Sequence, residues 1–300
     1  MKSNADANMG MFVTEMEDIH FFGRDREIRL FKQWLLNTES NNKILNIYGI
    51  GGSGKTYLLH AFERMTDHEN DLFLHIDCRD FIQTPLTLAE NLLIQLYNKY
   101  PNIEQNKSYT LQECLFLLQH ISQEKRIVIA VDAYEQMREL ERWFRNTFLK
   151  NLPGNTYIVI SGRNPLKGEW EESPAWRKII TRMKLSDFSY SVTKQYLSHY
   201  EIDREDLLKR IWVITKGNPL ALSLAVLSIE KINKETKWIN RDKSNYSPVL
   251  LQLTRAWLAE TPDFSTGQAH VGSTYCFSLF VHVAAMFRVQ KLHFGYRNWQ

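Results

Sequence analysis

Residues 44–56 of this 300-residue chain read Ile44-Leu45-Asn46-Ile47-Tyr48-Gly49-Ile50-Gly51-Gly52-Ser53-Gly54-Lys55-Thr56, and this stretch decides the fold. Its first five residues are a short apolar run that ends at glycines, as strands do before a turn. The residues that follow, 56–65, are rich in helix formers. The stretch therefore predicts a strand, a glycine-rich turn and a helix, in that order.

The turn has the pattern of a phosphate-binding loop, G-x-x-x-x-G-K-[ST]. Its glycines allow positive φ angles and close approach of the backbone, so that successive N–H groups can surround a polyphosphate. The following helix points its positive end at the same anion. Lys55 is predicted to neutralise the β and γ phosphates, and the Thr56 hydroxyl to ligate Mg²⁺. The predicted nucleotide-binding residues of the loop are Gly49, Gly51, Gly52, Ser53, Gly54, Lys55 and Thr56.

A later apolar strand, Ile127–Val131, is followed directly by Asp132. Ligands of open α/β sheets bind at the carboxyl ends of the strands. Asp132 is therefore predicted to hold Mg²⁺, directly or through water, opposite Thr56. The alternative is an aspartate that only ends a strand at a turn.

Many phosphate-loop ATPases carry a second acid immediately after this aspartate, but here that residue is Ala133. Glu135 is the substitute candidate for general base, unless it is only a solvated glutamate at a helix start. Arg163 follows the buried run Tyr157–Ile160, where an arginine can stabilise transferring charge. A surface arginine in a loop is its alternative role.

Strand-like and helix-like segments alternate in the first two thirds of the chain. Continuous β-branched runs such as Ile127–Val131 are typical of strands covered on both faces. The predicted fold class is α/β, a P-loop NTPase with a mostly parallel five-stranded sheet flanked by helices and followed by a small helical lid domain. The other predicted strands are Leu72–Ile76, Tyr157–Ile160 and the weaker Ile179–Leu185, and the other predicted helices are Arg26–Leu36, Leu86–Tyr100, opened by Thr84 and Pro85, and Leu111–Ser122.

From Ser191 onward the strand pattern gives way to helical segments, which places a domain boundary near Asp187. Gly217 can end one helix, while Asn218 and Pro219 cap and start the next. The expected organisation is a tail (1–20), a nucleotide-binding domain (21–187), a helical lid (188–235) and an incomplete or atypical segment (236–300). The predicted helices of the lid are Val192–Tyr200, Asp206–Thr215 and Leu220–Ile232.

Composition leaves the partners open. The hydrophobic share of 44% and the charged share of 24% are those of a soluble globular chain, and a net charge of +3 indicates neither nucleic acid nor membrane. Three cysteines at irregular spacing, Cys78, Cys114 and Cys276, favour free thiols in a reducing cytosol. The polar N-terminus lacks a secretory signal, and Tyr275–Phe287 is too short to span a membrane. A cytoplasmic location is therefore expected.

The end of the chain is unusual, because residues 264–300 contain no Asp or Glu. We expect a truncated or frame-altered tail there, with an ordinary small subdomain as the alternative. A different reading of the loop also has to be considered, because Gly49-x-Gly51-x-x-Gly54 matches the dinucleotide-binding motif, and Asp77 lies at a suitable distance to hold a ribose. A dinucleotide site, however, has no use for Lys55-Thr56 or for Asp132.

Together these motifs resemble the STAND class of P-loop ATPases, which are AAA+ relatives that include the NB-ARC domains. The resemblance covers roughly residues 21–232. Phe21–Glu27 is similar to the opening hydrophobic-Gly-Arg-acidic motif of that class, which lies beside the nucleotide, and Gly217-Asn218-Pro219 is similar to its G-x-P motif. The positions of the phosphate loop, Asp132 and the sensor-like Arg163 also agree.

The resemblance implies a 5-1-4-3-2 strand order, Gly23 and Arg24 beside the nucleotide, and Pro219 near the adenine. It also implies ADP-bound rest and ATP-bound activation, usually with homo-oligomerisation. No Asn-Lys pair continues to the x-Asp that would select guanine, so ATP and ADP with Mg²⁺ are the expected ligands. Protein partners cannot be read from the sequence.

The predicted function is a STAND-type signalling switch that binds ATP-Mg²⁺ and hydrolyses it slowly. The first alternative is an AAA+-like DNA-associated ATPase or transcription regulator whose DNA-binding part lies outside this chain. The second, which follows from Ala133, is a nucleotide-binding scaffold that does not hydrolyse. A dinucleotide-dependent oxidoreductase is the most distant alternative.

Overall fold

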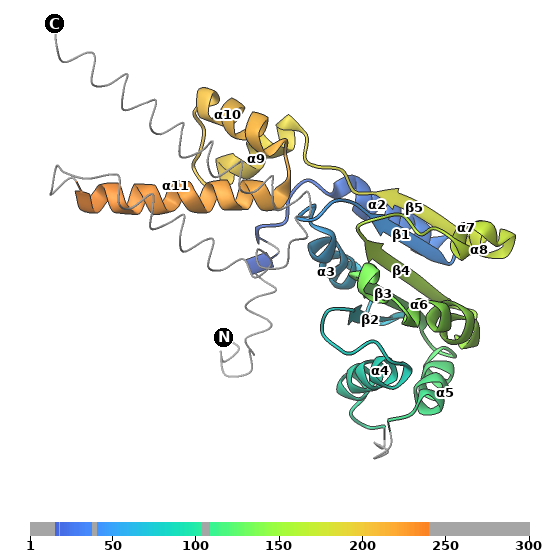
Figure 1. Ribbon diagram of the computed structural model, residues 1–300. Coiled ribbons are helices and arrows are strands. Elements are labelled where there is room, and N and C mark those ends of the chain that lie inside the picture. Colours follow the sequence, from blue (N-terminus) through green and yellow to red (C-terminus); the bar gives the residue numbers. More distant parts are fainter. Residues whose placement is uncertain (1–15, 18, 38–40, 104–108, 240–300) are drawn as a thin grey trace, which may run out of the picture. The chain divides into compact units, whose positions relative to one another are not determined.

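The computed structural model describes residues 16–17, 19–37, 41–103 and 109–239 (Figure 1). Within this part, contacts divide the chain into two units between Ser186 and Asp187, and Gly51–Ser53 group with the later unit. The acid-free tail, with Cys276 and the apolar run Tyr275–Phe287, lies outside the described residues. No described helix is long and apolar enough to cross a membrane.

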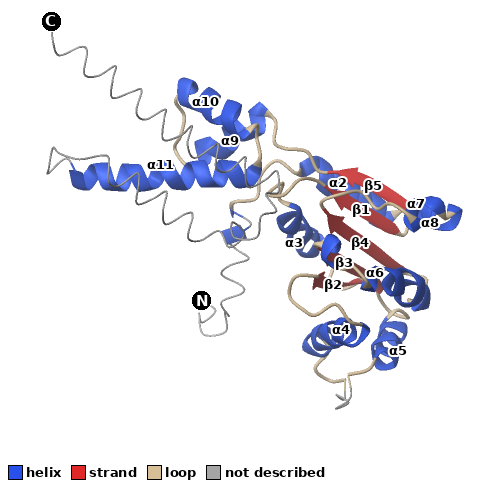
Figure 2. Ribbon diagram, viewed as in Figure 1, coloured by secondary structure: helices blue, strands red, loops and turns tan. Residues whose placement is uncertain are grey.

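The first unit contains one parallel sheet with helices on both sides (Figure 2). Its order is β2-β3-β4-β1-β5, and all four neighbouring pairs are parallel. This confirms the predicted fold class and the strand order that the resemblance implies. The strands are β1 (Ile44–Tyr48), β2 (Asp71–Asp77), β3 (Arg126–Asp132), β4 (Thr156–Gly162) and β5 (Ile180–Lys184).

Two apolar clusters cover the two faces of the sheet. On one face α2 (Asp25–Leu36) and α3 (Lys55–Met65) bury side chains such as Phe31 and Phe62 against the strands. On the other face α4 (Pro85–Lys99) and α5 (Leu111–Ile121) bury a leucine-rich cluster. Each fully buried leucine or phenylalanine contributes about 1.5–3 kcal/mol, so this double burial stabilises the strands as predicted from their continuous apolar runs.

Local signals fix where these helices begin. Thr84 accepts from the Thr87 backbone N–H in a capping box and Pro85 is the first residue of α4, as predicted. Thr110 caps α5 in the same way through the Glu113 backbone N–H. Cys78 and Cys114 are buried free cysteines, and burial raises the pKa of each thiol to about 12.

Two helical segments were not predicted. Between β3 and β4 the chain forms η1 (Tyr134–Gln136), α6 (Leu140–Trp143), the π-helical η2 (Phe144–Phe148) and η3 (Leu149–Asn151). Between β4 and β5 it forms α7 (Glu169–Glu172) and α8 (Pro174–Ile179). These pieces are too short to show a helical period, and long-range packing determines them: Trp170 of α7 is fully buried and lies across the Arg145 guanidinium.

The described residues of the second unit, which end at residue 239, form three helices, α9 (Tyr190–His199), α10 (Glu205–Thr215) and α11 (Pro219–Ile239). Gly217 has a φ of +79°, and a Cβ there would lie 2.1 Å from the Phe188 carbonyl oxygen. Only glycine fits at position 217 for that reason. Asn218 then accepts from the Ala221 backbone N–H at 3.2 Å, so the predicted corner at 217–219 is confirmed. Helix α11 extends seven residues past the predicted end.

Candidate functional site

The phosphate loop joins β1 to α3. Gly52 and Gly54 have φ angles of +74° and +87°, and Gly54 is the residue that precedes α3. Lys55 Nζ donates to the backbone oxygens of Gly49 at 2.8 Å and Ile50 at 3.0 Å. Burial lowers the pKa of Lys55, and the nearby carboxylates of Glu135 and Asp132 oppose that change. The lysine is thus folded back along the loop that precedes it.

Asp132 ends β3 and is almost completely buried. The Thr56 hydroxyl donates to Asp132 Oδ2 at 2.5 Å, and the Ser161 hydroxyl donates to Oδ1. Two oxygens that ligate one octahedral Mg²⁺ at 2.0–2.1 Å lie about 3 Å apart. Thr56 and Asp132 therefore need to separate by only a few tenths of an ångström to share such an ion, and this donor pair fits Mg²⁺.

Glu135 and Arg163 form an ion pair with each other. Arg163 Nε lies 3.2 Å from Glu135 Oε1, and the Arg163 backbone N–H donates to Oε2 at 3.2 Å. Ala133 before them has a φ of +48°, which turns the chain at the end of β3. The predicted general base is therefore bound to the predicted sensor arginine.

Gly23 and Arg24 precede α2. Gly23 has a φ of +65°, and the buried Arg24 guanidinium donates to the Ser186 carbonyl oxygen at 2.8 Å. In the first unit this arginine thus binds the segment that follows β5. Pro219 is the first residue of α11 in the second unit.

Two residues that were not assigned to the metal site lie beside Asp132. Asp77 ends β2 and is the register partner of Asp132 on β3. Arg79 donates from Nε to both Asp77 oxygens at 2.8 and 3.0 Å, and its Nη2 also lies 3.3 Å from Asp132 Oδ2. The sequence signal for Asp77 was an acidic residue at the end of a predicted strand. This signal points to the metal site only when the strand order, which places β2 beside β3, is known.

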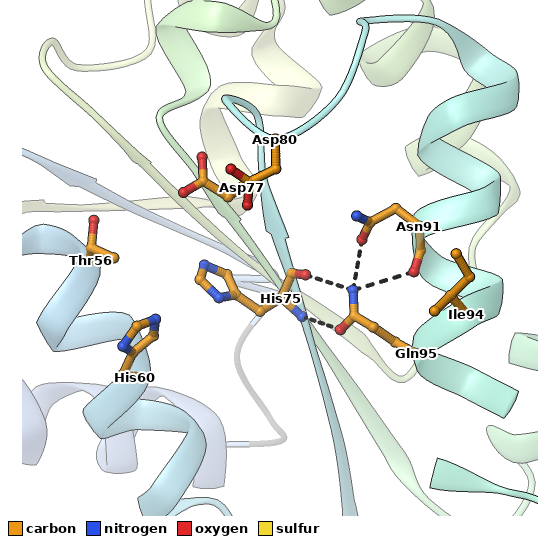
Figure 3. Close-up of a pocket in the computed structure, with 8 residues that line it drawn as sticks. All are labelled: Thr56, His60, His75, Asp77, Asp80, Asn91, Ile94 and Gln95. Carbon is orange, nitrogen blue, oxygen red and sulfur yellow. Dashed lines mark hydrogen bonds between the residues drawn. The ribbon is translucent and has the colours of Figure 1, made fainter. Parts of the chain in front are cut away.

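A cavity of about 400 Å³ extends from Thr56 along the edge of β2 (Figure 3). Gln95 closes this edge, because its side-chain amide accepts from the His75 backbone N–H at 2.9 Å and donates to the His75 carbonyl at 2.7 Å. Burial and the neighbouring His60 lower the pKa of His75. The cavity is lined by Thr56, His60, His75, Asp77, Asp80, Asn91, Ile94 and Gln95.

A parallel sheet of this order, with a glycine-rich loop between its β1 and a helix, defines the P-loop NTPase fold. A family model described as an AAA domain matches residues 38–164, which include the phosphate loop, Asp132 and Arg163. The match covers less than half of the chain, and its description does not name the STAND or NB-ARC class. Comparison with curated proteins gave no significant match.

Several solved structures resemble this chain at low identity. The Orc1 protein of Aeropyrum pernix, solved in complex with DNA, is 14% identical over 72% of this chain and 61% of its own, with a TM-score of 0.49. Cdc6p of Pyrobaculum aerophilum is 16% identical over 70% and 63%, also with a TM-score of 0.49. Drosophila ORC bound to DNA is 19% identical over 93% and 70%, with a TM-score of 0.45. The chain thus spans less than two thirds of the length of the Orc1 protein and of Cdc6p. A likeness at this level says nothing about function.

Proposed function

We propose that this chain binds ATP and ADP with Mg²⁺ at the loop Gly49–Thr56. The observation that carries the proposal is the 2.5 Å contact between the Thr56 hydroxyl and Asp132 Oδ2. A threonine at the start of a helix that follows a glycine-rich loop, held against a buried strand-end carboxylate, has the ligand set that a nucleotide-bound Mg²⁺ uses.

Each residue would have a separate task. The loop backbone would donate to the phosphate oxygens, while Lys55 would exchange its carbonyl contacts for the β and γ phosphates. Thr56 and Asp132 would hold Mg²⁺, which neutralises charge on the phosphates when it is bound. Gly23, Arg24 and Pro219 are proposed to lie at the nucleoside, as the family resemblance implies.

We propose slow hydrolysis rather than rapid turnover. Ala133 cannot orient water, so the function of a general base falls to Glu135. Arg163 holds that carboxylate in an ion pair, and the pair must open before Glu135 can accept a proton. Arg163 would then be free to stabilise charge on the phosphate.

Two roles for such an ATPase remain proposals. The AAA domain match supports an AAA+-like ATPase, the class that the DNA-associated alternative names, and its description does not name the STAND class. Duplex DNA binding that weakens steeply with added salt would favour the first role. A chain that does not bind DNA at low salt but forms homo-oligomers with ATP would favour the second.

Calorimetric titration with ATP and ADP in the presence of Mg²⁺ tests the site. Lys55→Ala should weaken binding by roughly 10- to 100-fold, because a hydrogen bond to a charged group contributes about 1.5–3 kcal/mol. Lys150→Ala, which changes an exposed lysine of η3, is the matched control and should bind like the wild type. Equal binding by wild type and Lys55→Ala would refute the assignment of the loop.

A further inference from the structure

The carboxyl ends of β2 and β3 bring two carboxylates together. Asp77 and Asp132 are register partners on neighbouring parallel strands, and little of either side chain is exposed, 16% for Asp77 and 3% for Asp132. Two carboxylates this close repel each other in a partly buried site. Such a pair attracts cations strongly.

Arg79 supplies the cation. Its guanidinium forms a two-pronged pair with Asp77, and its Nη2 reaches Asp132 Oδ2 at 3.3 Å. Asp132 Oδ2 also accepts a hydrogen bond from the Thr56 hydroxyl, while the Ser161 hydroxyl donates to Asp132 Oδ1. Both oxygens of the proposed metal ligand are thus engaged, and a positive charge stands beside one of them.

A divalent ion on Asp132 would feel this charge directly. An ion about 2.1 Å from Oδ2 could lie no more than about 5 Å from Arg79 Nη2, because that nitrogen is 3.3 Å from the same oxygen. Protein ligands alone are also few, because no group of three or more His, Cys, Asp or Glu within the described ranges could hold a metal ion. Phosphate oxygens of a bound nucleotide would supply both the missing ligands and the negative charge that offsets Arg79.

We propose that Arg79 keeps divalent cations off the Asp77–Asp132 pair until a nucleotide binds, so that metal and nucleotide enter the site together. The proposal deepens the proposed function and rests on it for the role of the nucleotide. Arg79 is then a positioning residue that sets the order of binding. Its side chain is 53% exposed, so it can leave Asp132 without crossing a packed core.

The proposal can be tested without nucleotide by titrating the protein with Mn²⁺ alone. Binding is measured as the loss of the free-ion signal in electron paramagnetic resonance. Removing one positive charge about 5 Å from a divalent ion should strengthen Mn²⁺ binding by roughly 10- to 100-fold in Arg79→Ala. Arg79→Lys keeps the charge and should bind Mn²⁺ nearly as weakly as the wild type. Asp77→Asn added to Arg79→Ala should abolish most of the gain.

The chain offers a matched control in Arg204. It forms a similar two-pronged pair with Asp206, two residues away, and both residues belong to the second unit. Arg204→Ala should leave Mn²⁺ binding unchanged. If Arg79→Ala does not fold, as judged by thermal unfolding, Arg79→Gln replaces it.

Two results would overturn the proposal. One is a folded Arg79→Ala or Arg79→Gln that binds Mn²⁺ no more tightly than the wild type, and the other is an Arg79→Lys that gains as much affinity as Arg79→Ala. A separate ATP titration of the same proteins tests the proposed function. Failure of every variant to bind ATP would count against the nucleotide site, whereas the Mn²⁺ comparison would still decide whether Arg79 excludes metal.

Discussion

Replacing Glu135 by glutamine separates its contribution to the fold from its contribution to hydrolysis. The structure predicts a small structural effect, because the side chains of the Glu135–Arg163 pair are 30% and 51% exposed and the ion pair is 3.2 Å long. Exposed pairs of this kind contribute about 0.2–1 kcal/mol. Glutamine also retains an acceptor oxygen for the Arg163 backbone N–H.

The free energy of unfolding should therefore fall by less than about 1 kcal/mol, which is a change in Tm of less than about 4 °C for a domain of this size. The effect on chemistry should be far larger. A positioned general base contributes about 10²- to 10⁴-fold to a rate, so phosphate release should fall by that factor. ATP affinity should rise by no more than about five-fold, because the Glu135–Arg163 pair with which the phosphates compete contributes at most about 1 kcal/mol.

The assay is single-turnover phosphate release with ATP bound to excess protein, paired with thermal unfolding of the same samples. Glu139→Gln, an exposed glutamate at the start of α6, is the control and should match the wild type in both measurements. Phosphate release by Glu135→Gln at the wild-type rate would refute the assignment of the base. A wild type no faster than Lys55→Ala would instead favour the non-hydrolysing scaffold.

Two further predictions concern stability. The fold lowers the pKa of His75. As the pH falls through about 6.5, the unfolded chain therefore takes up a proton before the folded chain does. The free energy of unfolding should keep its maximal value above that pH and decline below it. His75→Gln should flatten this decline in urea titrations, whereas the exposed His120→Gln should not. Trp170→Ala should lower the free energy of unfolding by about 3–5 kcal/mol, because Trp170 is fully buried and its indole N–H donates to Glu141 at 2.9 Å. Phe116→Ala, at a side chain that is 70% exposed, should change the urea midpoint little, and equal effects of the two would contradict the packing argument.

The regular part of the fold was predictable from local pattern. Residues 44–48 form β1 with the predicted bounds, and α4 begins where Thr84 and Pro85 indicated. The pieces between β3 and β4 were not predictable, because Phe144 and Phe148 bury themselves from a π-helical turn that has no sequence period of its own. Their positions depend on partners from other segments, such as Trp170.

The candidate site divides in the same way. Lys55 and Thr56 lie in one contiguous motif, and Asp132 follows a strand that its apolar run identifies. Arg79 and Ser161 carry no such signal, since each contacts Asp132 only because β2 and β4 flank β3 in the sheet. The role of Glu135 was also predicted without its partner, because nothing in the sequence places Arg163 within 3.2 Å of it.

The charges around Lys55 explain why these unpredicted contacts matter. Glu135 and Asp132 raise its pKa, while Arg163 and Arg79 lower it, so all four act on the same point of the loop. Each arginine is paired with one of these carboxylates, Arg163 with Glu135 and Arg79 with Asp132. A triphosphate is an anion that competes with both carboxylates for the two guanidinium groups. Binding of the proposed ligand would therefore release the candidate base and the candidate metal ligand in one step, whereas in its absence each is held by an arginine.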